Sequence, residues 1–289
     1  MARASRLLGL GAPFIVGGPG DETFDAEVLD HRLRREASEG RRIAAIVATA
    51  GSARTGAFDD MVELAAVAKA HSVWLHVDGA FGAWARLLPD SARVRGLELA
   101  HSVALDYHKA IHAPYATGAV LVRRRGALQR ALAEPSDYLS GFPGGFGGLK
   151  DWPGERSLAT SRGFGALGVW ATWAGAGHGA LKAGVEQSYT LAQELEERLR
   201  RAGWLTAPVH GPIVAFGPPS REGLGWSSPR PAQKIVTELQ HRGEAVITPV
   251  RLGGRWALRA CTLGLGTTLV DIDALVNFLS ELYSVGPQR

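Results

Sequence analysis

Short apolar, β-branched runs alternate with stretches of helical periodicity through the first half of this chain. Residues 43–49 (IAAIVAT), 73–77, 103–107 and 119–123 resemble strands, and residues 59–71 carry apolar side chains at helical spacing. Continuous apolar strands separated by helices are typical of a parallel sheet that is buried on both faces. The pattern therefore predicts a doubly wound α/β layer, in which reactive groups gather at the carboxyl ends of the strands.

The carboxyl-terminal part is predicted to form a second, smaller unit. Residues 141–154 contain six glycines and two prolines without a period, which predicts a mobile loop. A helical region then follows at residues 164–201, with a glycine-rich interruption at 175–179. Strand-like segments lie at 213–216, 245–248 and 256–259, and a helical segment lies at 270–283. We expect a large domain over residues 1–176 and a small carboxyl-terminal α/β domain over residues 177–289.

The composition limits the classes of protein to which the chain can belong. With 46% apolar and 21% charged residues it is globular, and its apolar runs are far shorter than a membrane span. The 32 basic and 28 acidic residues leave a net charge of +4, with one basic tract at residues 123–125, so we expect no nucleic-acid partner. The single cysteine, Cys261, excludes an internal disulfide and a cysteine-based zinc cage, and we expect a cytoplasmic protein.

Polar side chains are concentrated where three of the predicted strands end. These side chains are Thr49 after the first strand, His76 and Asp78 at the second, and Asp106, His108 and Lys109 at the third. In a parallel sheet these ends lie side by side along one edge. Because Asp78 and Lys109 are about one βαβ unit apart, an acid and an amine are expected near each other there.

Asp78 and Lys109 each have an ordinary structural explanation. A carboxylate after a buried strand often caps a helix or forms an ion pair, and a lysine beside apolar residues usually extends to the surface. Lysine is scarce in this chain, however, and a desolvated amine is nucleophilic toward an aldehyde. Together the two residues fit pyridoxal phosphate, because a lysine forms an imine with it and a carboxylate keeps its ring nitrogen protonated.

A metal site is the competing interpretation of the same residues. His76 and Asp78, with His108 and His112 four residues apart, offer imidazole and carboxylate ligands. Lys109 opposes this interpretation, because it places a cation beside the proposed ligands. The interval between His108 and His112 also lacks a glutamate that could act as a general base, so we expect no metal.

Five stretches of the chain, in order, resemble the group II pyridoxal-phosphate-dependent amino-acid decarboxylases, which include aromatic amino acid, glutamate and cysteine sulfinate decarboxylases. They are VATAGSARTGAFDD, WLHVDGAFG, SVALDYHKAIHAPYATGAVLVR, SLATSRGFGALGVWATWAGAGHGAL and WALRACTLGLGTT. The combination of HVDGA with HK is the most specific of them, and the resemblance covers essentially the whole chain. It implies a type I pyridoxal-phosphate fold like that of aspartate aminotransferase, with a partial large domain on a mainly parallel sheet.

The resemblance also implies which residues hold pyridoxal 5'-phosphate. Lys109 would form the imine, and Asp78 would pair with the pyridinium nitrogen. His108 would contact the phosphate, Ala80 would pack on one face of the ring, and Thr49 would lie near its Asp78 side. The cofactor site is thus expected at the strand ends that the residue pattern already singled out.

Two further residues are implied to lie near the substrate. His76 would lie close to both the ring and the substrate. Arg259 matches an arginine that in some members lies near the distal carboxylate of the substrate, and a strand-edge ion pair is the alternative for it. The implied reaction is loss of CO2 from an amino acid, which makes the chain a carboxy-lyase acting as a homodimer. A related aldehyde synthase or carbon–carbon lyase remains open.

The chain also departs from the family pattern. Members begin well upstream of Met1 with a glycine-containing phosphate loop and a ring-stacking histidine, and no segment here resembles either. We therefore expect an amino-terminally truncated chain with about four of seven large-domain strands, weak cofactor binding and little activity. Gly264 stands where an asparagine is expected, and residues 142–151 lack the tyrosine that protonates the carbanion in many decarboxylases, with Tyr138 preceding that place.

Overall fold

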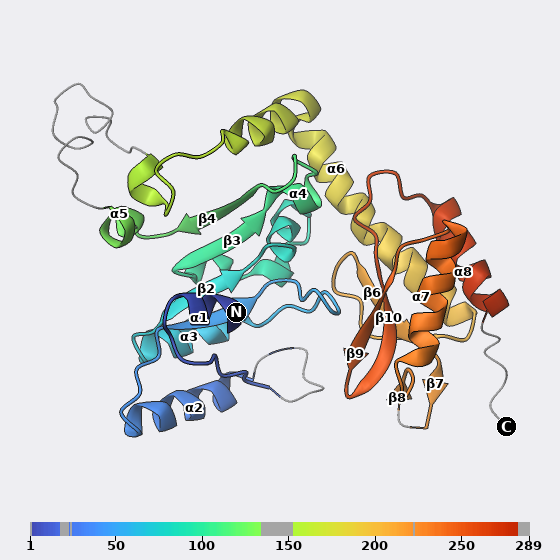
Figure 1. The fold of residues 1–289 in the computed structure, drawn as a ribbon, viewed down its shortest axis with the longest axis horizontal. Coiled ribbons are helices and arrows are strands. Elements are labelled where there is room, and N and C mark those ends of the chain that lie inside the picture. Colours follow the sequence, from blue (N-terminus) through green and yellow to red (C-terminus); the bar gives the residue numbers. More distant parts are fainter. Residues whose placement is uncertain (1, 18–22, 24, 134–152, 222, 283–289) are drawn as a thin grey trace.

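Two β-sheets with their flanking helices make up the computed structural model, which describes residues 2–17, 23, 25–133, 153–221 and 223–282. The first sheet belongs to the amino-terminal half and the second to the carboxyl-terminal part, and the long helix α6 (Gly165–Arg201) extends from one to the other (Figure 1). None of the described helices combines the length and the apolar character that crossing a membrane requires.

The first sheet has the strand order β1-β2-β3-β4, made of β1 (Ala45–Thr49), β2 (Trp74–Asp78), β3 (Ser102–Asp106) and β4 (Gly118–Val122). β1, β2 and β3 are parallel, as predicted, whereas β4 runs antiparallel to β3. The direction of β4 corrects the parallel arrangement expected for the strand at residues 119–123, while the sheet stays mainly parallel as expected. Only a short helix and a loop separate β3 from β4, and a parallel return needs a longer crossover.

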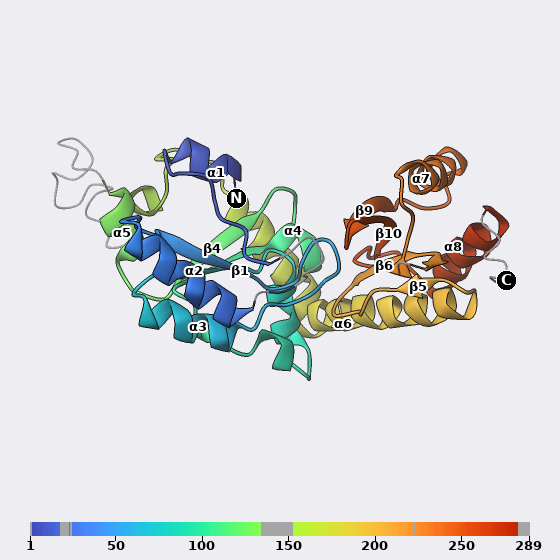
Figure 2. The same cartoon turned by 90° about the horizontal axis from the view of Figure 1, so that it is seen from below.

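Helices and short 3-10 turns surround this sheet. They are α1 (Ala2–Leu7), α2 (Ala26–Ser38), α3 (Met61–Ala70), η1 (Gly82–Leu87), η2 (Ala92–Val94), η3 (Leu97–Leu99), α4 (Tyr107–Ala110), α5 (Ala127–Leu132) and η5 (Pro153–Arg156). α2 and α3 lie side by side on one face of the sheet (Figure 2). Leu33 of α2 and Leu64 of α3 share one buried cluster with Leu75 of β2, so this face holds the core of the first unit.

α6 is interrupted at Gly177, where φ is 77° and ψ is 158°. Glycine tolerates this conformation because it has no Cβ to clash with the backbone. The buried side chains of the helix all follow the interruption, beginning at Leu181. The predicted domain boundary after residue 176 coincides with this change of direction, and the division into two domains stays a prediction.

The second sheet is antiparallel and has the order β5-β6-β10-β9. Its strands are β5 (Leu205–Thr206), β6 (Ile213–Gly217), β9 (Thr248–Leu252) and β10 (Arg255–Cys261), and a small ribbon pairs β7 (Pro219–Ser220) with β8 (Gly223–Leu224). α6, α7 (Arg230–Arg242) and α8 (Leu269–Leu282) enclose its main core, where Trp204, Phe216 and Leu258 are almost fully buried.

The strand predicted at residues 245–248 was placed too early, because β9 begins at Thr248. β9 and β10 form a hairpin in which Leu252 pairs with Arg255, so the turn consists of Gly253 and Gly254. Both glycines have positive φ, as a two-residue hairpin turn requires. The turn therefore fixes where β9 ends and β10 begins.

Candidate active site at the strand ends

The carboxyl ends of β1, β2 and β3 meet at one edge of the first sheet. Thr49 pairs in register with Asp78, and Asp78 pairs with Ala104. β3 continues two residues further to Asp106, and α4, which carries His108 and Lys109, starts at the next residue. The structure thus brings Thr49, Asp78 and the start of α4 to the same edge, as the sequence predicted.

Asp78 ends β2 with a partly buried carboxylate. Its Oδ1 accepts a hydrogen bond from the backbone N–H of Ala80 at 3.2 Å. Among the described residues it has no cationic partner within ion-pair distance, and it does not cap η1, whose N-cap position is Phe81. Neither ordinary explanation of Asp78 therefore applies in the described part of the chain, and the remaining lone pairs of its carboxylate are available to a ligand.

Thr49 is held through Asp59, which the sequence analysis did not single out. The N–H of Thr49 donates to Oδ2 of Asp59 at 2.6 Å, and the N–H of Asp59 donates to the carbonyl of Thr49 at 3.0 Å. Asp59 is 6% exposed, so these two hydrogen bonds join the ends of the loop after β1 in a buried position. Its place in the stretch VATAGSARTGAFDD, just before the following helix, was a usable sequence signal.

Two glycines allow the loops after β1 and β2 to touch. A Cβ at Gly51, where φ is 84°, would lie 2.8 Å from Cα of Gly82. Gly82 also donates its N–H to the carbonyl of Ala50 at 3.0 Å. No larger residue fits this approach, so the spacing of the first two strand ends depends on both glycines.

Lys109 pairs with Asp106. Its Nζ lies 2.8 Å from Oδ2 of Asp106, and its side chain is 38% exposed. The ammonium group is therefore partly exposed to solvent and paired with Asp106, and its predicted role opposite Asp78 stays a prediction. Asp106 was noted only as a polar strand end, although its position directly before the His108–Lys109 pair was a usable signal.

His108 is oriented by a backbone contact. Its Nδ1 lies 2.8 Å from the carbonyl oxygen of Thr117, and because a carbonyl only accepts, Nδ1 carries a hydrogen. Nε2 is the nitrogen left for other partners, and it lies 3.7 Å from Oδ2 of Asp106. The ring also packs against Tyr115, with 4.4 Å between ring centroids.

Ala80 links two of the strand ends. Its carbonyl accepts the N–H of Asp106 at 3.2 Å, while its N–H is the donor to Asp78 described above. Its methyl group is partly buried. Ala80 therefore connects the carboxylate of Asp78 to the backbone of Asp106.

His76 lies two residues before Asp78, so both side chains emerge on the same face of the sheet. Its Nδ1 is 2.8 Å from Oγ of Ser102 on β3. Burial lowers the pKa of His76, and the nearby charge of Asp78 acts more weakly in the opposite direction. The imidazole is therefore uncharged at neutral pH.

Arg259 lies on β10, in the interior of the second sheet. The alternative of a strand-edge ion pair is wrong for the described residues, because β10 has a strand on each side and Arg259 has no ion-pair partner there. Its Nε is buried without a hydrogen-bond partner in the same part of the chain. An unsatisfied buried donor of this kind is costly unless something else accepts from it.

The segment that follows β10 approaches the segment that follows α4 through His112. This imidazole forms a hydrogen bond with the backbone of Leu263, and burial lowers its pKa more than that bond raises it. Leu263 also packs beside Ile111. α4 ends at Ala110 and His112 has a φ of 53°, so His108 and His112 do not share a helix face as the metal interpretation assumed.

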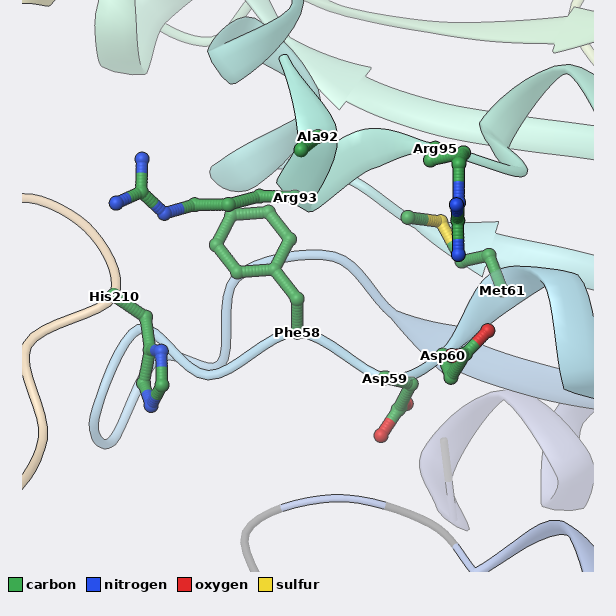
Figure 3. A pocket seen from close by; sticks show the side chains of 8 residues that line it. All are labelled: Phe58, Asp59, Asp60, Met61, Ala92, Arg93, Arg95 and His210. Atoms are coloured by element: carbon green, nitrogen blue, oxygen red, sulfur yellow. The ribbon is translucent and has the colours of Figure 1, made fainter. Parts of the chain in front are cut away.

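A cavity of about 230 Å³ lies near, but apart from, these strand ends (Figure 3). Phe58, Asp59, Arg93, Arg95 and His210 are among its lining residues, and none of the predicted site residues is. Two of its lining residues reach the end of β1: Asp59 holds Thr49, and Phe58 bridges to Ala50. Tyr138 and residues 141–152 of the predicted loop lie outside the described residues, and the last two residues of that loop, 153 and 154, begin η5.

Comparison with known proteins gives a consistent result. The model of the pyridoxal-dependent decarboxylase conserved domain matches residues 16–216. An aromatic-L-amino-acid decarboxylase of Bacillus atrophaeus is 30% identical over 292 residues, which cover 98% of this chain and 61% of the relative. An L-2,4-diaminobutyrate decarboxylase of Rhizobium meliloti is 33% identical over 272 residues, covering 93% of this chain and 51% of the relative.

The likeness extends to solved structures. A crystal structure of Oryza sativa TDC with PLP and tryptamine matches with a TM-score of 0.86 and 21% identity, covering 97% of this chain and 59% of that chain. At this identity the match concerns the fold, and it supports the expected type I fold. The chain spans between about half and three-fifths of the lengths of the proteins that it matches here.

Proposed function

Because the chain belongs to the family of pyridoxal-dependent decarboxylases, we propose that it uses pyridoxal 5'-phosphate to remove the carboxyl group of an amino acid as CO2. The relatives named above are decarboxylases of amino acids, which supports this reaction class. They act on different side chains, one aromatic and one carrying an amine. The proposal therefore stops at an amino-acid substrate and leaves its side chain open.

The observation that carries the proposal is that an amine and a carboxylate without a cationic partner lie at neighbouring strand ends. Asp78 has no cationic partner among the described residues, and Lys109 lies just beyond the end of the adjacent strand. A protonated pyridine nitrogen is the kind of partner such a carboxylate lacks. The donor set thus fits the cofactor, whose bound ring supplies a sink for the electrons that remain when CO2 departs.

Lys109 is the residue proposed to bind the cofactor covalently through Nζ. Its ammonium group is held by Asp106 at 2.8 Å, so it must lose a proton before it attacks an aldehyde. Asp106 orients the amine in the meantime. Thr49 and Ala80 are proposed to line the ring beside Asp78, since the register and the backbone contacts of both place them at that edge.

His108 is the proposed contact to the cofactor phosphate. Its Nδ1–H is already engaged by Thr117, so Nε2 is the nitrogen available to an anion. Nε2 donates only when both ring nitrogens carry hydrogen. The contact proposed for the phosphate is therefore made through Nε2, while Nδ1 stays engaged by Thr117.

Arg259 is the proposed partner of a distal carboxylate on the substrate, because its buried Nε lacks an acceptor among the described residues. His76 is proposed to contact the substrate beside the ring.

We further propose a cytoplasmic homodimer. Sedimentation velocity with and without pyridoxal phosphate measures the oligomeric state directly, and a strictly monomeric chain in both samples would contradict the dimer.

Reductive trapping tests the covalent site. The chain is mixed with pyridoxal phosphate, reduced with borohydride, digested and mapped, and the label is expected on Lys109. Lys182 provides a matched control, because its side chain is 39% exposed and it also pairs with an acid, Glu186, at 3.6 Å. Lys109→Arg should abolish the label and Lys182→Arg should leave it in place, whereas a label spread over several lysines would refute the assignment.

Product analysis tests the reaction itself. CO2, ammonia and aldehyde are measured together with aromatic, acidic and basic amino acids as substrates. CO2 with an amine and without ammonia supports decarboxylation. CO2 accompanied by equal amounts of ammonia and aldehyde identifies the aldehyde synthase alternative instead, and absence of every product despite a labelled Lys109 would reject the activity of this chain.

A further inference from the structure

Three side chains form a hydrogen-bonded row on the face of the first sheet that carries Asp78. Trp74 and His76 are two residues apart on β2, and Ser102 on β3 pairs in register with His76. Nε1 of Trp74 lies 2.8 Å from Oγ of Ser102, and the same oxygen lies 2.8 Å from Nδ1 of His76. Ser102 is therefore the middle member of the row.

The hydrogens of this row can be assigned from the chemistry of its members. An indole N–H only donates, so Oγ of Ser102 accepts from Trp74. Ser102 has one hydrogen of its own, it is 7% exposed, and no other acceptor for that hydrogen exists among the described residues. If Nδ1 of His76 donated to Ser102, the serine hydrogen would be buried without a partner, which proteins avoid.

We infer that Trp74 and Ser102 are positioning residues that hold His76 as the imidazole whose hydrogen is on Nε2. The serine hydroxyl donates to Nδ1, and the indole prevents that hydroxyl from turning round. His76 then offers a hydrogen-bond donor rather than a base to an oxygen atom of the substrate. The identity of that substrate rests on the proposed function, but the state of the imidazole does not.

The surroundings of His76 agree with this assignment. Burial lowers its pKa, so the ring carries a single hydrogen at neutral pH. Nε2 has no hydrogen-bond partner in the described part of the chain, which leaves its N–H free for a ligand. A fixed donor in a water-poor site requires no rearrangement when a ligand arrives, which is the general advantage of such positioning.

Nuclear magnetic resonance of the chain labelled with 15N in its histidines tests the inference without any cofactor. Two-bond proton–nitrogen correlations distinguish the two tautomers of each ring, and His76→Gln assigns the signals of His76. The native chain is expected to show His76 only with hydrogen on Nε2. Nδ1 as the protonated nitrogen, or an exchanging mixture of both forms in the native chain, would overturn the inference.

Substitutions in the row show whether its hydrogen bonds select the tautomer of His76 or whether the imidazole prefers that tautomer by itself. Ser102→Ala removes the donor to Nδ1 and Trp74→Phe frees the serine hydroxyl to rotate, so each should produce a mixture of tautomers or a shifted Nδ1 resonance. Ser102→Thr restores a hydroxyl and should restore the native signals. If Ser102→Ala leaves the His76 signals as they are in the native chain, the row has no positioning role.

Ser188→Ala is the matched control. Ser188 is 4% exposed and its hydroxyl donates to the carbonyl of Val185 at 2.7 Å, so the same atom is removed from an equally buried site outside the row. It should leave the His76 signals unchanged. If reductive trapping fails while the tautomer result holds, the proposed function is wrong and this inference stands; the reverse outcome rejects only the inference.

Discussion

Asp106 connects two of the five residues that the family resemblance assigned to the cofactor. It pairs with Nζ of Lys109 and lies near Nε2 of His108, while its own N–H is held by Ala80. A carboxylate in this position can hold a proton-bearing amine and a proton-bearing imidazole at once. Asp78 has no ion-pair partner among the described residues, so we expect the two acids at this edge to have separate roles.

Asp78→Asn tests the proposed pairing of this carboxylate with the ring nitrogen of the cofactor. The substitution keeps the shape and removes the charge that would pair with the ring nitrogen. Loss of one charge-assisted hydrogen bond costs about 1.5–3 kcal/mol, so turnover should fall roughly 10- to 100-fold. Steady-state rates of CO2 release measure this.

Asp90→Asn is the matched control for that substitution. Oδ1 of Asp90 accepts from the N–H of Ala92 at 3.0 Å, the same local hydrogen bond that Asp78 makes with Ala80. It should leave turnover unchanged. Equal effects of both variants would show that the loss at Asp78 comes from the backbone turn rather than from the site.

At the scale of elements, the start of α3 supports the loop that holds Thr49. Asp60 caps this helix, and its Oδ1 accepts from the N–H groups of Val62 and Glu63 at 2.9 and 3.0 Å. The adjacent residue is Asp59, which binds Thr49. The cap therefore positions both a helix and a strand end.

Asp60→Ala should lower the free energy of unfolding by about 1 kcal/mol, because two helix N–H groups lose their acceptor. Urea titration followed by circular dichroism measures the change. Asp60→Asn retains an acceptor and should be nearly neutral. A loss of the same size with asparagine would assign the effect to charge rather than to capping.

α6 carries a second test at this scale through Tyr189, which packs against core residues of the first sheet and against the cluster around Ile111. Burial raises its pKa to about 12, and the nearby Arg93 only partly opposes this. The unfolded chain loses this proton near pH 10. The contribution of the neutral ring is therefore complete below pH 10 and is lost as the pH rises to about 12.

Tyr189→Phe removes the ionisable group and should flatten this part of the stability profile between pH 10 and 12. Thermal unfolding at several alkaline pH values checks it, with the native chain as the reference. The two proteins should differ little near neutral pH, since the hydroxyl is the only group removed. Parallel profiles up to pH 12 would contradict the burial of this phenol.

At the scale of the whole molecule, the first sheet ends in β4, which pairs only with β3 among the described strands. Leu121 on this strand is 54% exposed and Val120 beside it is also exposed. An edge strand with exposed apolar side chains invites pairing with other chains. Self-association is therefore expected to begin at this edge.

Leu121→Lys should reduce aggregation several-fold, because a charged side chain opposes edge-to-edge pairing. Light scattering during storage at fixed concentration measures the rate. Leu269→Lys is the matched control. Leu269 is 45% exposed, like Leu121, but it belongs to a helix and therefore offers no strand edge to another chain. If both substitutions act equally, added charge explains the result and the edge does not.

The sequence alone predicted the parallel strands, their polar ends and the family, because these follow from local patterns. Apolar runs identify β1, β2 and β3, and the residues after them carry His76, Asp78, His108 and Lys109 whatever the rest of the chain does. The family model and the fold match agree with that interpretation. The assigned roles of the site residues stay predictions.

Only the tertiary structure decided which partners these side chains have. The pairing of Lys109 with Asp106, of Thr49 with Asp59 and of His76 with Ser102 depends on register and loop geometry. The direction of β4 and the extent of β9 depend in the same way on the connections around them. Contacts between residues distant in sequence are set by packing the whole chain, and local periodicity carries no information about them.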